Sequence, residues 1–232
     1  EYDKPLLDVL EKDPELLEQN REILKSFYSV FKQADASLRF VFLTGVTKVL
    51  QSSAFGGFNQ ALDISITNKF EALCGFTEEE VFKYFAKPIR EMAVVEGCRE
   101  EEIRQRLKQH YDGYHFSENL TDIYNPFSVL NTLHSQNISD YWTTNGIPLY
   151  LVRLINNFHG DINELINKYY LPNEFINYKA DTEYPLPMIY QSGYLTIKDY
   201  EKESNLFLLG FPNNEVKNSF LAMVTTNYST SA

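Results

Sequence analysis

The sequence is poor in the residues that hold metal ions or staple small domains. Its two cysteines, Cys74 and Cys98, stand singly with no CxxC spacing, and its four histidines form no HxxxH pair. These counts argue against a zinc site and a disulfide framework, and they favour a reducing compartment. The longest apolar stretch, around residues 40–46, is far shorter than the ~18–20 residues of a membrane span, and the acidic N-terminal segment has no signal-peptide shape. We therefore expect a cytoplasmic protein with no membrane partner.

Positive charge is also scarce. Lys and Arg number 21 against 32 Asp and Glu, which gives a formal charge of −11. The field of the whole molecule therefore repels phosphate backbones, and a nucleic-acid binder would need a local basic patch. Hydrophobic residues make up 44% and aromatic residues 15% of the chain, a balance typical of a globular protein. The 232 residues suffice for one large domain or two small ones.

Most of the chain has the apolar periodicity of amphipathic helices. Thr77 followed by Glu80 forms a capping box ahead of an apolar helical pattern, and Asn125 precedes a proline suited to a first helical turn. The expected helices begin near Pro14, Thr77, Arg99, Pro126 and Gly146, and a further helix is expected over residues 164–178.

Strand patterns are fewer. Residues 38–45 form a continuous apolar run ending in Gly45, which is typical of a strand buried on both faces of a parallel sheet, and residues 62–66 are the other candidate in this half. Because such a sheet needs several strands, we expect the earlier strands to lie outside this chain. Residues 194–200 and 206–210 predict a hairpin, followed by a helix from Asn213, an order that resembles the wing of a winged-helix domain.

Two segments have residues suited to nucleotide chemistry. EYDKP at residues 1–5 places Glu1 and Asp3 together, as at the strand end where an NTPase holds Mg²⁺ and orients water. Thr44, Thr47 and Lys48 follow the expected strand, where ligands dock in open α/β sheets. Solvated terminal acids and a simple strand-capping turn are the plain alternatives. Two further segments, residues 146–148 and YDGY at residues 111–114, are by themselves a helix start and a turn.

Taken in order, the motifs EYDKP, FVFLTGVTK, GFTEEEVFKYF, YDGYHF, NPFSVL, NGIPLYL, QSGYLTI and GFPNNEV resemble the AAA-ATPase-like family of bacterial proteins, over about residues 1–224. That family is similar to STAND-type P-loop ATPases and often carries a PD-(D/E)XK nuclease-like domain at its C-terminus. The resemblance implies that this chain starts inside the motif bearing the Mg²⁺-side acids. The chain contains no GxxxxGK[ST] phosphate loop and no nuclease signature after residue 200.

The resemblance also implies roles for individual residues. Glu1 would be the catalytic acid that polarises the attacking water. Thr44 and Lys48 would face the γ-phosphate, and Gly146, Ile147 and Pro148 would contact adenine. No residue of this chain is expected to ligate the metal directly. ATP and Mg²⁺ are therefore implied for the full-length protein, whereas this chain, lacking the phosphate loop, is expected to bind neither tightly and to be catalytically incompetent.

The expected fold is mainly α with minor β. We divide it into the C-terminal part of an ATPase core (residues 1–72), a helical lid domain (73–165) and a winged-helix-like subdomain (166–232). The expected partners are the missing N-terminal ATPase segment, a second copy by self-association, and an unknown protein. Because Lys198, Lys202 and Lys217 alternate with acidic residues, DNA binding is not favoured. The alternative is a helical protein-interaction module with no nucleotide function; a nuclease fragment would need an acidic metal cluster.

Overall fold

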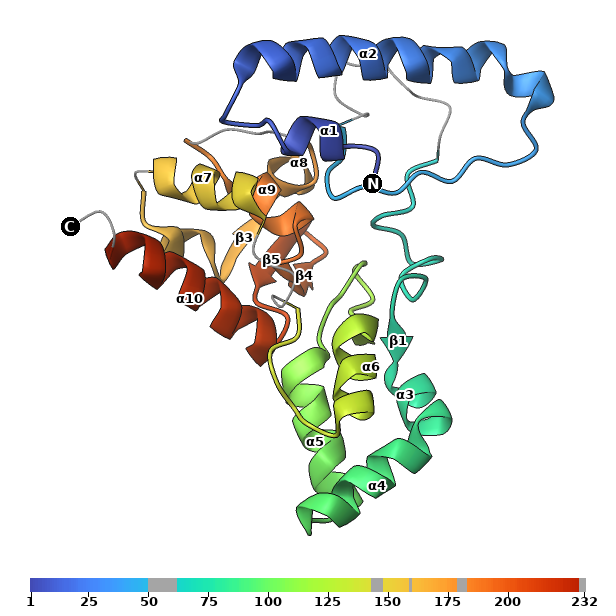
Figure 1. Cartoon of the computed structure of the whole chain (residues 1–232), viewed down its shortest axis with the longest axis vertical. Helices are drawn as coiled ribbons and strands as arrows, with labels where there is room; N and C mark the ends of the chain where they lie inside the picture. The colour runs from blue at the N-terminus through green and yellow to red at the C-terminus, as the bar shows by residue number, and fades with distance from the viewer. Residues whose placement is uncertain (50–61, 143–147, 159, 179–182, 230–232) are drawn as a thin grey trace. The chain divides into compact units, whose positions relative to one another are not determined.

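The computed structural model describes residues 1–49, 62–142, 148–158, 160–178 and 183–229. It is mainly helical with two small antiparallel sheets, which confirms the expected fold class (Figure 1). The chain divides into two compact units. Unit 1 comprises residues 1–63, 148–161 and 171–193, and unit 2 comprises residues 64–147, 162–170 and 194–232. The contiguous three-part division drawn from the sequence stays a prediction.

Unit 1 is built on a long amphipathic helix. Asp13 caps its N-terminus by accepting a hydrogen bond from the Leu16 N–H at 2.9 Å, and Pro14 fills the first position, as the sequence predicts. Tyr28 on its inner face packs in a cluster with Leu6 and Val49. The elements of unit 1 are α1 (Lys4–Leu7), α2 (Pro14–Gln33), η1 (Asp35–Ser37), α7 (Leu149–Asn157), α8 (Pro172–Phe175) and α9 (Leu186–Gln191).

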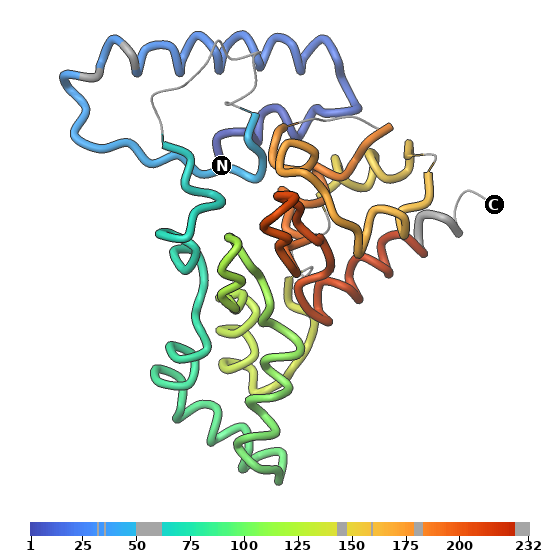
Figure 2. The backbone as a smooth tube through the Cα atoms, turned by 180° about the vertical axis from the view of Figure 1, so that it is seen from behind, coloured from blue at the N-terminus to red at the C-terminus, as the bar shows by residue number. Residues whose placement is uncertain are grey.

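Unit 2 contains the predicted capping box. The Thr77 hydroxyl accepts from the Glu80 N–H at 3.3 Å, and the Glu80 carboxylate accepts from the Thr77 N–H at 2.9 Å. The helices behind it are α3 (Glu78–Tyr84), α4 (Ala86–Glu96), α5 (Glu100–Tyr111) and α6 (Pro126–Ser135), drawn in green shades in Figure 2. They enclose a core that includes Ile89, Ile103 and Tyr124. The first sheet pairs β1 (Phe76–Thr77) with β2 (Ile123–Tyr124).

The second sheet of unit 2 has the order β3–β5–β4, antiparallel throughout. Its strands are β3 (Lys168–Tyr170), β4 (Thr196–Glu201) and β5 (Leu206–Gly210), and η4 (Ile162–Leu165) precedes the first of them. The hairpin of β4 and β5 and the helix α10 (Asn214–Ser229) after it agree with the sequence pattern (Figure 1). Among the described residues, no helix combines the length and the hydropathy needed to cross a membrane.

The strand expected over residues 38–45 is not present. The segment is extended but belongs to no sheet, and Phe40 and Phe42 are 80% and 53% exposed. Its backbone bond to the N-terminal segment joins the Tyr2 N–H to the Thr44 carbonyl at 3.0 Å. A strand needs neighbours with which to form a hydrogen-bond ladder, and the described residues supply none here. Residues 62–66 likewise form no strand.

The helix expected over residues 164–178 is wrong for most of its length. Asn167 has a left-handed φ of 59°, which ends the short turn η4. The two tyrosines that follow enter β3, because they pair with β5. Pro172 then begins the separate short helix α8.

Candidate functional site

The acidic N-terminal segment of unit 1 is bound to the turn formed by residues 44–48. Asp3 is fully buried, and its carboxylate accepts hydrogen bonds from the Val46 N–H at 3.1 Å, the Thr47 N–H at 2.5 Å and the Thr47 hydroxyl at 2.7 Å. The Tyr2 hydroxyl also donates to the Thr47 carbonyl. A carboxylate that accepts several donors in this way fixes the backbone of the turn. We call this arrangement the Asp3–Thr47 clamp.

The clamp leaves no room at Gly45. A Cβ atom at this position would lie 2.7 Å from Asp3 Oδ1 and 2.8 Å from a ring carbon of Tyr2. Glycine therefore permits the close approach of the two segments.

Lys48 extends from the clamp in two directions. Its backbone N–H donates to Gln191 Oε1 at 2.9 Å, and its ammonium pairs with Asp63 at 2.7 Å. Gln191 in turn donates to the carbonyls of Phe175 and Ile176 at 3.3 and 2.9 Å. The turn is thus tied to α8 and α9 within unit 1.

The structure brings three of the residues predicted for the nucleotide site into one part of unit 1. Glu1 and Thr44 are exposed beside the clamp, and Lys48 is largely buried against Asp63. Pro148 precedes α7 as its N-cap residue. Gly146 and Ile147 lie outside the described residues. The functional roles of all six stay predictions.

Asp3 and Thr47 stand in the two polar motifs but are not among the predicted site residues. Nothing in a linear pattern links two positions 44 residues apart, and neither residue type is diagnostic alone. The available signal was the pairing of two short polar motifs, each beside an expected strand end.

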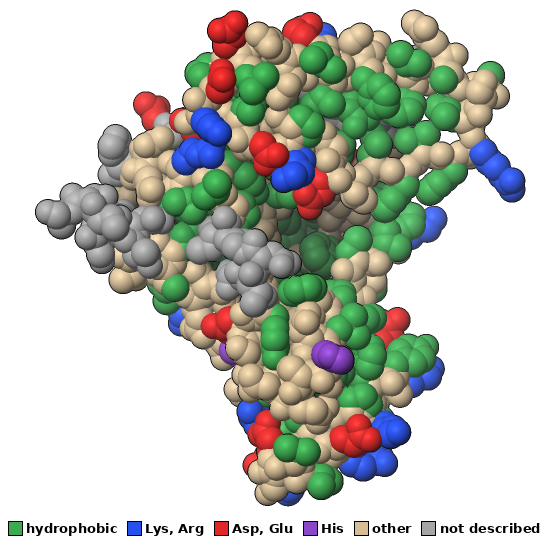
Figure 3. All heavy atoms as spheres, in the orientation of Figure 1, with side chains coloured by type: hydrophobic (Ala, Val, Ile, Leu, Met, Phe, Trp, Pro, Cys, Tyr) green, Lys and Arg blue, Asp and Glu red, His purple; other side chains and the backbone are tan. Residues whose placement is uncertain are grey.

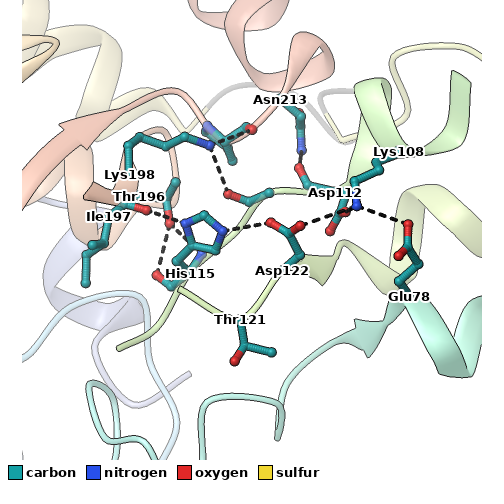
Figure 4. Close-up of polar contacts among 12 residues, drawn as sticks. Glu78, Lys108, Asp112, His115, Thr121, Asp122, Thr196, Ile197, Lys198 and Asn213 are labelled. Atoms are coloured by element: carbon teal, nitrogen blue, oxygen red, sulfur yellow. Dashed lines mark hydrogen bonds and ion pairs between the residues drawn. The ribbon is translucent and has the colours of Figure 1, made fainter. Parts of the chain in front are cut away.

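Four of the motifs that carry the resemblance meet in unit 2. YDGYHF begins at the last residue of α5, NPFSVL opens α6, the YLTI part of QSGYLTI enters β4, and GFPNNEV joins β5 to α10. The Ser128 hydroxyl donates to Glu215 at 2.9 Å, which joins the second motif to the fourth. The Asn213 side chain donates to the Asp112 carbonyl at 3.0 Å, which joins the fourth to the first (Figure 4).

An open pocket of about 310 Å³ lies between the first and the fourth of these motifs, and we call it the Asp112 pocket. Its lining residues are Lys108, Gln109, Asp112, Gly113, Asp122, Phe211, Pro212, Asn213, Asn214 and Lys217. Gly113 has a φ of 89°, and a Cβ there would lie 2.5 Å from the Pro212 carbonyl oxygen. The wall of the pocket therefore depends on this glycine.

On one side of the pocket, the Lys108 ammonium forms ion pairs with three carboxylates. Lys108 Nζ lies 3.0 Å from Glu78, 3.4 Å from Asp122 and 3.6 Å from Asp112 (Figure 4). The hydrogen bond to Glu78, with the charges of the other two acids, raises the pKa of Lys108 above its ordinary value, although burial opposes the change. Lys108 therefore remains charged at neutral pH.

His115 ties the YDGYH loop to β4. Its ring nitrogens lie 2.6 Å from the Ile197 carbonyl and 2.8 Å from Asp122, so both face acceptors (Figure 4). The Thr196 hydroxyl accepts from the His115 N–H at 2.8 Å and donates to the His115 carbonyl at 3.0 Å. Although burial raises it, the pKa of Asp122 is lowered overall by the hydrogen bond and charge of His115 and by Lys108.

Asp112 is the group in the pocket with the most unusual environment. Its side chain is 2% exposed, and neither carboxylate oxygen has a hydrogen-bond partner of good geometry among the described residues. Burial raises the pKa of Asp112 to about 6, and the adjacent Gly113 N–H and Lys108 only partly oppose this. Burial also lowers the pKa of Lys198, whose ammonium donates to the carbonyls of Gly113 and Pro212, both at 3.4 Å.

The resemblance implies a structural, packing role for YDGY and NPFSVL. Tyr111 is indeed fully buried in the core of unit 2. Asp112, its neighbour in the same motif, instead lines the pocket. Among the described residues, no group of three or more His, Cys, Asp or Glu side chains is placed to hold a metal ion.

Comparisons with known proteins match the first part of the chain to a family model and nearly all of the chain to part of a longer protein. Residues 1–55 match a family model, AAA-ATPase_like, described as a predicted AAA-ATPase. The chain is 34% identical to an uncharacterized protein in the vnfD 5' region of Azotobacter chroococcum mcd 1, over 98% of this chain and 42% of the relative. The chain therefore spans less than half the length of that relative. No solved structure matches it.

Proposed function

We propose that the chain is part of a longer AAA-type ATPase, in which it supplies the acid-bearing segment and the turn beside the γ-phosphate. The observation that carries the proposal is the match of residues 1–55 to the predicted AAA-ATPase model, together with the clamp that joins the two motifs inside that match. Together the two motifs contain the residue types that phosphoryl transfer uses: carboxylates, hydroxyls and ammonium groups.

Within this proposal, Glu1 polarises the attacking water, Thr44 and Lys48 contact the γ-phosphate of ATP, and Mg²⁺ is held by groups outside these residues. Lys48 must then leave Asp63, its present partner at 2.7 Å, when the nucleotide arrives. Residues 146–148 contact adenine. Kinship with STAND-type ATPases, a nuclease-like domain elsewhere in the longer protein and a winged-helix character for the β4–β5 hairpin belong to the same proposal.

The 232 residues contain no GxxxxGK[ST] sequence, so we further propose that a segment outside them supplies the phosphate loop. Without its backbone N–H groups and lysine, the chain alone is expected to hydrolyse no ATP, because phosphoryl transfer depends on those positioning groups. Micromolar ATP binding with turnover by the 232-residue chain in calorimetry would contradict this part of the proposal.

The test of the ATPase itself uses the longer protein. We expect Glu1→Gln to lower kcat by at least ~100-fold with little change in ATP affinity, as general-base groups contribute at least that much. Lys48→Met should weaken both ATP binding and turnover. Lys12→Met, which removes the same charge from an exposed site, is the matched control. Unchanged turnover in both site variants would overturn the assignment, and a longer protein with no nucleotide binding would favour an interaction module.

A further inference from the structure

We propose that the Asp112 pocket binds an arginine side chain of a protein partner. The inference concerns unit 2 and is independent of the ATPase proposal, which rests on unit 1. It starts from the pocket between YDGYHF and GFPNNEV, which the Asn213–Asp112 hydrogen bond joins, and from the buried carboxylate that lines it.

Among the described residues, no donor forms a hydrogen bond of good geometry with that carboxylate. An ionised carboxylate accepts through two oxygens, and leaving such a group buried without donors costs several kcal/mol. Both Asp112 oxygens are without a hydrogen-bond partner in the described part of the chain, although the side chain is 2% exposed. Lys108 contacts it at 3.6 Å but lies closer to Glu78 and Asp122. A ligand that brings donors would satisfy Asp112.

A guanidinium group suits the Asp112 carboxylate better than an ammonium or a metal ion. Two free oxygens on one carboxylate match the parallel N–H bonds of a guanidinium fork. Phe211 and Pro212 form an apolar wall of the pocket on which a planar cation can stack. A metal ion would need several carboxylates converging on one point, but in the described residues Lys108 occupies the space between Glu78, Asp112 and Asp122.

The form of the pocket and the charge of the chain indicate a macromolecular source for the arginine. The pocket is open on one side, so it can receive a side chain that projects from a second surface, whereas enclosed sites bury most of a small ligand. The chain has a formal charge of −11, which favours association with a basic partner. The partner is therefore expected to present an exposed arginine within a basic segment.

The charged groups around Asp112 determine how binding depends on pH. The charged groups are Lys108, Glu78, Asp122, Lys198 and Lys217. The neutral hydroxyl of Tyr124 is also nearby, and it stays protonated because burial and the Asp112 charge raise its pKa. Protonation of Asp112 removes the acceptor charge. Since Lys108 stays charged, arginine affinity should fall as the pH is lowered from 7.5 to 5.

The experiment titrates the 232-residue chain with Nα-acetyl-arginine amide and follows backbone amide signals by NMR. We expect saturable shifts at Gly113, Asn213 and Asn214, and none with Nα-acetyl-citrulline amide, which is neutral but similar in shape. Shifts of equal size with both compounds, shifts confined to other residues, or no shifts at millimolar concentration would overturn the proposal.

Three variants separate the pocket from the charge of the chain as a whole. Asp112→Asn should weaken binding at least ~10-fold, because the fork loses its charged acceptor. Glu79→Gln removes an exposed acid outside the pocket and should leave affinity unchanged. Lys217→Ala removes a like charge from the lining and should tighten binding ~2-fold. If Asp112→Asn does not fold, the other two measurements still test the proposal. Weaker arginine binding by Lys217→Ala, or an arginine affinity of the unsubstituted chain that is the same at pH 5 as at pH 7.5, would contradict it.

Discussion

At the scale of single residues, Gly97 and Gly113 both have a left-handed backbone, but only Gly113 lies in close contact with another segment. Comparing the two positions distinguishes the cost of backbone strain from the cost of a steric clash. Gly113 has a φ of 89° and lies against the Pro212 carbonyl, whereas Gly97 has a φ of 65° with nothing within 4 Å of a Cβ position. Both disfavour a side chain through their backbone, but Gly113 also has no space for one.

We therefore expect Gly97→Ala to lower the free energy of unfolding by about 1 kcal/mol and Gly113→Ala by about 3 kcal/mol or more. Denaturant unfolding of the two variants provides the measurement. Equal losses would mean that the YDGY loop and the segment before α10 separate easily, and the close approach at Pro212 would then be unimportant.

Asp112 should make stability depend on pH. Its pKa of about 6 in the folded protein lies above its unfolded value of 3.8, so the folded state holds the proton more tightly. Its stabilising contribution is complete below pH ~4 and is lost as the pH rises through ~6. Asp112→Asn should remove this dependence, so its unfolding free energy relative to the native chain should rise between pH 4.5 and 7. A difference that is flat with pH would contradict the raised pKa.

At the scale of elements, the Asp3–Thr47 clamp should stabilise the turn of unit 1. Asp3→Ala leaves the Val46 N–H, the Thr47 N–H and the Thr47 hydroxyl without their acceptor, and we expect a loss of about 2–4 kcal/mol. Thr47→Ser, which keeps the hydroxyl, should cost less than Thr47→Val. Hydrogen exchange at the Val46 and Thr47 amides reports the clamp directly, and protection that survives Asp3→Ala would refute its role.

The elements that the sequence predicted well are those specified by local signals. The capping box at Thr77 and Glu80, the Asn125 cap before Pro126 and the hairpin after Gly193 all depend on residues within a few positions of one another. Residues 38–45 were misread because an apolar run predicts a strand only if neighbouring strands exist. Residues 164–178 were misread because pairing with β5, a distant segment, overrides local helical preference.

The candidate site was predictable only in part. Short motifs located Glu1, Thr44 and Lys48, and the structure places them in one region of unit 1. The bonds from Asp3 to Thr47 and the pocket around Asp112 depend on contacts between segments 44 to 101 residues apart. No periodicity or spacing records such contacts, so they required coordinates.

At the scale of the whole molecule, exposed apolar side chains in unit 1 predict self-association. Ile23, Phe27 and Phe40 are 65%, 59% and 80% exposed, and Figure 3 shows hydrophobic side chains gathered over the α2 region. Sedimentation velocity should therefore detect oligomers of the chain at micromolar concentration, and Ile23→Glu with Phe27→Glu should reduce them. Lys12→Glu, also exposed, is the control for added negative charge. A monomer at all concentrations would contradict the expectation.

The path of the chain between the two units has a consequence for its synthesis. Tyr178 packs on the cluster of Leu6, Tyr28 and Val49, and Gln191 binds the turn at Lys48. The helices α1 and α2 therefore lack these contacts until residues 178 and 191 have been synthesised. A ribosome that adds about 5–20 residues per second leaves them without these contacts for roughly seven to thirty seconds. During that interval the apolar face of α2 is exposed on the nascent polypeptide, and chaperones that recognise exposed apolar segments are expected to bind it.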